Sequence, residues 1–147
     1  MNIKLRVSNL VKKHGTCNPY TLSNDLNIGV LTTRLPQSIR GFLVKPLRCK
    51  FILLNESLTE EASKIVICHE LGHARLHPGY GYYWHPNRTY FVPSKREREA
   101  NEFAAYLLSH SSDIDSDLIA AIINEKRPDP KTVHRILTEI INKQGGC

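Results

Sequence analysis

The sequence predicts an α+β fold in which a small antiparallel sheet is combined with several helices. Short apolar runs bounded by proline or glycine lie between residues 30 and 54, whereas longer segments with helical apolar spacing precede and follow them. The chain has 147 residues, enough for one domain with a buried core that needs no disulfides. We expect a single domain over residues 1–147, divided into helices and sheet (1–56), two helices and a loop (57–110) and C-terminal helices (111–147).

The N-terminal third predicts two helices and then three strands. Asn18-Pro19 is typical of an N-cap followed by proline at the first helical position. Gly15 is expected to end the helix before it. The predicted helices cover residues 5–13 and 18–26, and the predicted strands cover 30–35, 41–44 and 49–54, with a turn at 45–47 between the last two.

The rest of the chain predicts helices separated by one long loop. A helix is expected to open at Thr59 and to stop before Pro78, because the residue before proline disfavours helical geometry. Residues 78–93 are rich in glycine, proline and tyrosine and predict a loop. The remaining predicted helices run from 94 to about 109, from 113 to 125, and onward from Asp129-Pro130.

Charge and composition favour a soluble cytoplasmic protein. The net charge is +6, but basic residues are scattered along the chain, which favours an ordinary surface over direct nucleic-acid binding. No apolar run approaches the ~20 residues of a membrane span, and the first residues lack a signal-peptide core. All four cysteines are expected to be free thiols: Cys17, Cys49, Cys68 and Cys147.

The segment His69-Glu70-Leu71-Gly72-His73 predicts a metal site. Two histidines four residues apart on a helix lie one turn apart on the same side, so their imidazoles can converge on one ion. Both fall on the apolar stripe of their helix, where buried imidazoles need partners. Zinc suits this arrangement, with Glu70 beside it to act on water. The alternative is a pair of structural histidines bonded to backbone carbonyl groups.

A third ligand is expected from the helix that begins near residue 94. Glu97 lies about 60° from the centre of that helix's apolar face, whereas Glu99 lies about 100° from it. Glu97 could instead close a capping box with Ser94, and Glu99 is then the substitute ligand. Asn101 follows Glu97 by one turn and could hydrogen-bond a histidine ligand.

His77 lies one turn beyond His73, but Pro78 disfavours helical geometry there. We therefore expect a structural or substrate-side role for His77 in place of direct ligation. The longer metzincin pattern is absent, because Leu76 and Gly79 stand where it needs glycine and histidine.

The two segments together resemble the ImmA/IrrE family of bacterial and phage metallopeptidases. The resemblance rests on His69-Glu70-Leu71-Gly72-His73-Ala74-Arg75-Leu76-His77 and on the run Glu97-Arg98-Glu99-Ala100-Asn101-Glu102-Phe103-Ala104-Ala105-Tyr106-Leu107-Leu108. It implies a minimal zincin-like fold in which His69, His73 and Glu97 hold Zn²⁺ and Glu70 is the catalytic glutamate. It also implies a protein substrate, a cognate helix-turn-helix repressor whose cleavage switches on genes.

Peptide-bond hydrolysis is therefore the expected activity. Loop residues could add a donor for the developing oxyanion, and the candidates are Tyr82, Tyr83, His85 and Tyr90. Two other classes remain open: a zinc-bound module that sequesters a repressor without cutting it, and a basic nucleic-acid-binding protein in which the His-Glu-His helix is structural. The intact Glu70 favours the peptidase, because binding alone needs no general base.

Overall fold

The computed structural model describes residues 1–45, 49–77, 94–111 and 116–123, together with the pairs 132–133, 135–136 and 138–139. The elements in these residues are five helices and three strands: α1 (Ile3–His14), α2 (Pro19–Asp25), β1 (Ile28–Thr33), β2 (Gly41–Val44), β3 (Lys50–Asn55), α3 (Glu60–Leu76), α4 (Ser94–Leu108) and α5 (Ser116–Ile123). The α+β class predicted from the sequence is confirmed. None of these helices is long and apolar enough to cross a membrane.

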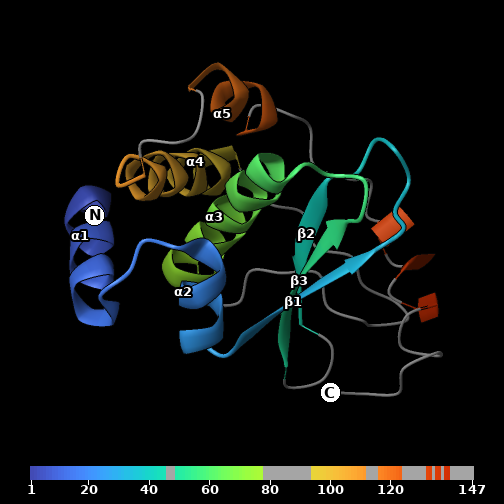
Figure 1. Cartoon of the computed structure of the whole chain (residues 1–147), viewed down its shortest axis with the longest axis horizontal. Coiled ribbons are helices and arrows are strands. Elements are labelled where there is room, and N and C mark those ends of the chain that lie inside the picture. Colours follow the sequence, from blue (N-terminus) through green and yellow to red (C-terminus); the bar gives the residue numbers. More distant parts are fainter. Residues whose placement is uncertain are drawn as a thin grey trace.

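Helix α3 occupies the centre of the molecule. The sheet lies on one side of α3, and α1 and α4 lie on the other (Figure 1). Of the 17 residues of α3, 12 are buried, including the whole segment from Ile65 to His73. The predicted metal-site segment therefore belongs to the most enclosed helix of the described structure.

The helix starts are set by side-chain caps that the sequence predicts. Asn18 accepts hydrogen bonds from the backbone N–H groups of Tyr20 and Thr21, with Pro19 at the first helical position of α2. Thr59 accepts a hydrogen bond from the backbone N–H of Ala62 and caps α3. Thr59 thus marks the start of α3, and the period of 3.6 residues places His69 and His73 on one side of that helix.

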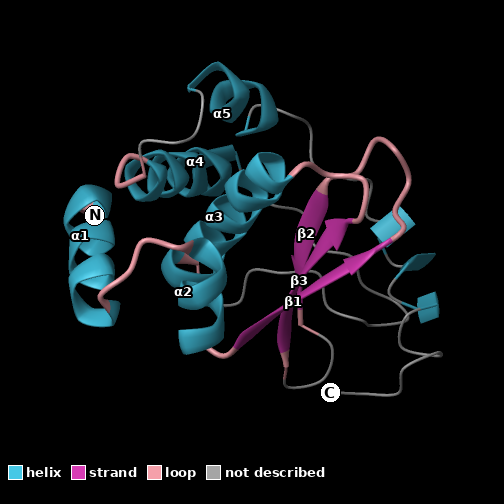
Figure 2. Ribbon diagram, in the orientation of Figure 1, coloured by secondary structure: helices cyan, strands magenta, loops and turns pink. Residues whose placement is uncertain are grey.

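The sheet is mixed, so the expectation of a wholly antiparallel sheet is wrong for one strand. Its order is β1-β3-β2; β2 pairs with β3 antiparallel, as expected, but β1 pairs with β3 parallel (Figure 2). β3 lies between the other two strands, and its apolar side chains Ile52, Leu53 and Leu54 are buried.

The two faces of the sheet bury different sets of side chains. Leu43, Ile52 and Leu54 pack in the main core with α3. Phe42, Val44 and Leu53 point the other way, as the period of two in a strand requires, and pack with Val133 and Ile136 in a second cluster. The sheet thus supports α3 on one face and is covered by C-terminal residues on the other.

The cysteines only partly follow the sequence-based expectation. Cys17 and Cys68 are free thiols, and burial raises the pKa of Cys68, which keeps that thiol protonated and unreactive. Cys49 is disulfide-bonded, so the expectation of a free thiol is wrong at this position. The cysteines are widely spaced in sequence, and nothing in that spacing signals a pair brought together by folding. Cys147 lies outside the described residues.

Candidate metal centre

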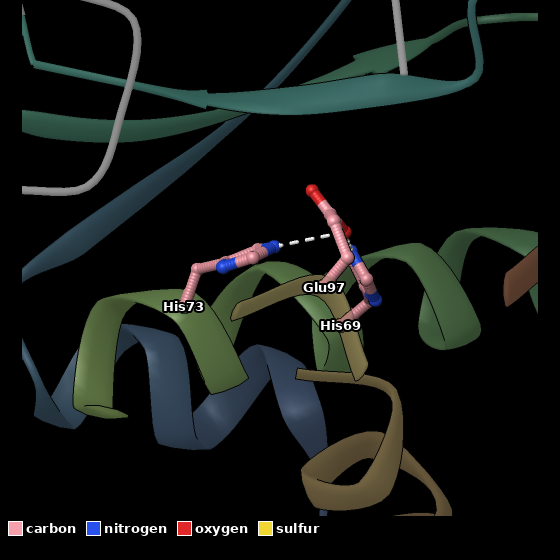
Figure 3. Close-up of side chains that lie close together, drawn as sticks. All are labelled: His69, His73 and Glu97. Atoms are coloured by element: carbon pink, nitrogen blue, oxygen red, sulfur yellow. Dashed lines mark hydrogen bonds and ion pairs between the residues drawn. The ribbon is translucent and has the colours of Figure 1, made fainter. Parts of the chain in front are cut away.

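Helices α3 and α4 bring three potential metal ligands together. The Nε2 atoms of His69 and His73 lie 3.0 Å and 3.2 Å from Oε2 of Glu97. His69 and His73 project from adjacent turns of α3, while Glu97 comes from the first turn of α4, and the three groups point toward one another (Figure 3). The sequence-predicted set is therefore assembled in space from segments 24 and 28 residues apart.

Gly72 allows the two helices to approach closely enough for this contact. A Cβ atom at Gly72 would lie 3.1 Å from both the Cα and the carbonyl oxygen of Ala100, and 3.1 Å from Cβ of Phe103. The backbone of α3 therefore packs almost directly on the backbone of α4, with no side chain between them. Because Ala100 lies one turn after Glu97, this contact also sets the distance from Glu97 to the histidines.

We expect Gly72→Ala to weaken metal binding despite the higher helix propensity of alanine. Alanine stabilises a helix interior by about 1 kcal/mol relative to glycine, but overpacking typically costs about 1–3 kcal/mol. The displaced α4 would carry Glu97 away from His69 and His73. Zinc titration in competition with a chelator, alongside urea unfolding, measures both effects. A variant that is more stable and binds zinc with unchanged affinity would show that the close helix contact does not set the site.

Burial prepares His73 to act as a ligand. Its side chain is fully buried, and desolvation lowers the pKa of His73, although the hydrogen bond to the Glu97 carboxylate opposes this shift. A lowered pKa favours the neutral imidazole, the form that coordinates a metal ion. His69 lies edge-on to His73, with ring centroids 4.8 Å apart.

Glu70 lies beside this cluster without belonging to it. Its side chain is 0% exposed, and its carboxylate acts electrostatically on His73. The structure therefore places the Glu70 carboxylate in a buried position from which it acts electrostatically on a candidate ligand, and its predicted role in catalysis stays a prediction.

Glu99, the substitute ligand, points to a different partner. Its Oε1 atom lies 3.1 Å from Nε2 of His77, and Nδ1 of His77 lies 3.0 Å from Nδ1 of His73. The structure thus brings Glu97, and not Glu99, to the two histidines of the motif. The contact between His77 and His73 is a feature that the sequence analysis missed; the spacing of four residues between them was the available signal.

Two further sequence-based expectations concern the capping box of Ser94 with Glu97 and a hydrogen bond from Asn101 to a histidine ligand. The side chain of Ser94 lies outside the described residues, so the capping box is not visible, but the Glu97 carboxylate faces the histidines. Asn101 makes no hydrogen bond to a histidine within the described part of the chain. Its Oδ1 atom and Nδ1 of His69 are both buried there without a partner. The loop residues Tyr82, Tyr83, His85 and Tyr90 fall outside the described residues.

The arrangement fits a divalent metal ion. Ligands at ~2.0–2.2 Å around a tetrahedral zinc ion lie about 3.3–3.6 Å from one another. Here the two nitrogen–oxygen distances are 3.0 Å and 3.2 Å, and all three ligand atoms lie within 4.8 Å of one another. Two imidazole nitrogens and one carboxylate oxygen form a donor set typical of catalytic zinc sites. His69, His73 and Glu97 are therefore positioned to bind a metal ion.

Comparison with known proteins agrees with this geometry. The sequence profile described as the IrrE N-terminal-like domain, peptidase family M78, matches residues 24–118. The chain belongs to this family. The matched residues of this M78 chain include α3, α4 and all three side chains of the candidate metal centre. The resemblance to the ImmA/IrrE family inferred from the two motifs is thereby confirmed.

Two relatives of this M78 chain come from Bacillus and one of its phages. It is 42% identical over 106 residues to an uncharacterized immunity region protein 2 of Bacillus phage phi105, covering 72% of the chain and 67% of the relative. It is 33% identical over 108 residues to metallopeptidase ImmA of Bacillus subtilis strain 168, covering 72% of the chain and 62% of the relative. No solved structure shows significant similarity to the chain.

Proposed function

We propose that the protein is a zinc-dependent endopeptidase of the cytoplasm. The observation that carries this proposal is the convergence of His69, His73 and Glu97, with the buried Glu70 beside them. In this proposal the two histidines and Glu97 hold the ion, and Glu70 is the general base. Membership of the M78 family supports the same chemistry.

Each residue then has a defined task in hydrolysis. When bound, zinc supplies Lewis-acid polarisation of a water molecule and of the scissile carbonyl group. Glu70 removes a proton from the attacking water and delivers it to the leaving amine. Glu70 is fully buried, so bulk solvent does not compete for its carboxylate. His69, His73 and Glu97 keep the ion on the side of α3 where Glu70 acts.

The proposed substrate is a helix-turn-helix repressor carried by a separate chain. The resemblance to the ImmA/IrrE family suggests this class, and a relative named for a phage immunity region supports a role in phage or mobile-element regulation. The protein would then act as an anti-repressor. The alternative is a zinc-bound module that sequesters the repressor without cleaving it.

Co-incubation with the helix-turn-helix protein encoded beside its gene tests this proposal. We expect defined fragments by mass spectrometry with zinc present, and intact substrate after zinc is removed with a chelator. Fragments that persist with the chelator would contradict a metal-dependent peptidase. A stable complex with uncut repressor, formed at stoichiometric concentrations, would instead favour sequestration.

A further inference from the structure

We infer that His77 and Glu99 are positioning residues that select the tautomer of His73 competent for metal binding. The inference rests on the proposed zinc site, but it concerns how that site is prepared and not which reaction follows. It assigns a task to two side chains that are not among the three proposed zinc ligands.

The contacts form one continuous chain of polar atoms. Glu97 Oε2 lies 3.2 Å from Nε2 of His73, whose Nδ1 lies 3.0 Å from Nδ1 of His77. Nε2 of His77 in turn lies 3.1 Å from Oε1 of Glu99. Both imidazoles are shielded from solvent, with side-chain exposures of 0% for His73 and 5% for His77. Solvent therefore has little access to these contacts.

The number of hydrogen atoms in this chain of polar atoms is compatible with a metal ion at one end. Three contacts join Glu97, His73, His77 and Glu99, but two neutral imidazoles carry only two N–H groups. With both imidazoles neutral, the form in which histidine coordinates a metal ion, one of these contacts lacks a hydrogen atom. A metal ion between Glu97 and His73 removes the deficit, because coordination uses a lone pair of Nε2 and needs no proton there.

The carboxylate of Glu99 fixes the direction of the remaining two hydrogen bonds. An ionised carboxylate can only accept, so Nε2–H of His77 donates to Glu99 and Nδ1 of His77 becomes an acceptor. Nδ1–H of His73 then donates to Nδ1 of His77. This leaves the lone pair of His73 on Nε2, the atom that faces Glu97 and His69. A ligating histidine commonly donates its second N–H to a carboxylate; here an imidazole is interposed between the two.

The local sequence explains how this chain of polar atoms is assembled. His77 is the C-cap of α3, with φ −124° and ψ 78°, and its backbone N–H still donates to the carbonyl oxygen of His73 at 2.9 Å. The ring of His77 therefore stays one helical turn C-terminal to His73, while its backbone leaves the helix before Pro78. Glu97 and Glu99 are two residues apart on α4, about 200° around the helix. Glu97 therefore contacts His73 at one end of this chain of polar atoms, and Glu99 contacts His77 at the other.

Zinc affinity of matched variants tests the inference. We expect His77→Ala to lower zinc affinity by about 10–100-fold, the usual effect of removing a partner of a metal-binding histidine. Glu99→Ala should lower it by a smaller factor, and Glu97→Ala by more than either. His77→Asn offers an amide oxygen near the position of Nδ1 and should restore part of the loss. His110→Ala and Glu102→Ala, at exposed positions on and after α4, should leave affinity unchanged.

Nitrogen-15 NMR of the zinc-loaded protein gives a second measurement. Its result would not change in the His77 variants if His77 only stabilised the fold. In the unmodified protein His73 should be coordinated through Nε2 and protonated on Nδ1, with a slowly exchanging N–H. His77→Ala should speed that exchange, and His77→Asn should slow it again. The inference is overturned by unchanged affinity in His77→Ala, by an unprotonated Nδ1 in the unmodified protein, or by absence of zinc binding. Zinc binding that depends on His77 without repressor cleavage would uphold it and contradict only the proposed peptidase.

Discussion

Replacing Glu70 by glutamine is expected to abolish cleavage while leaving the metal in place. Glutamine has nearly the same shape and fits the same fully buried position, but its amide cannot accept the proton of the attacking water. Loss of a general base typically lowers kcat by ~10²–10⁴-fold. The fold should persist, because glutamine keeps the size and shape of the buried side chain.

The measurement pairs cleavage rate with zinc content. Glu70→Gln should bind one zinc ion per chain and show little product over the time in which the unmodified protein completes digestion. Glu102→Gln is the matched control, because Glu102 is an exposed carboxylate on α4 and should retain full activity. Turnover near the unmodified rate in Glu70→Gln would refute the assigned mechanism.

Replacing His73 by alanine is expected to have the largest effect on the metal site itself. His73 is fully buried and joins Glu97 on one side to His77 on the other. Its removal deletes a ligand and leaves a cavity between α3 and α4. A ligand present at 1,000 times its Kd stabilises a folded protein by about 4 kcal/mol, and the variant should lose this zinc-dependent increment as well as packing energy.

Thermal or urea unfolding with and without zinc measures this loss. The unmodified protein should unfold at a higher denaturant concentration when zinc is present, and His73→Ala should show no such shift. His110→Ala removes an exposed imidazole after α4 and should keep the full zinc-dependent shift. An equal zinc-dependent shift in His73→Ala would place the metal elsewhere.

The sequence predicts α3 and its chemistry well because the information is local. Thr59 caps the helix, and the period of 3.6 residues then places His69 and His73 on one side. The helical angle of Glu97 relative to the apolar face of α4 likewise favoured it over Glu99, and the structure brings Glu97 to the histidines. These predictions needed only spacing along a single helix.

Features that depend on contacts between distant segments could not be predicted in this way. The place of β3 between β1 and β2 depends on the pairing of three strands that are separate in the sequence, a property of the assembled sheet. The approach of α3 to α4 at Gly72 requires both helices to be in place. The chain from His73 through His77 to Glu99 depends on ring orientations at the end of α3, which the spacing of residues does not specify.

The most direct test of the central claim is a crystal structure of the zinc-loaded protein with anomalous data collected at the zinc absorption edge. We expect one strong anomalous peak at ~2.0–2.2 Å from Nε2 of His69, Nε2 of His73 and a carboxylate oxygen of Glu97, with a further coordination position open. A peak bound by other residues, or Glu97 directed away from the ion, would contradict the account.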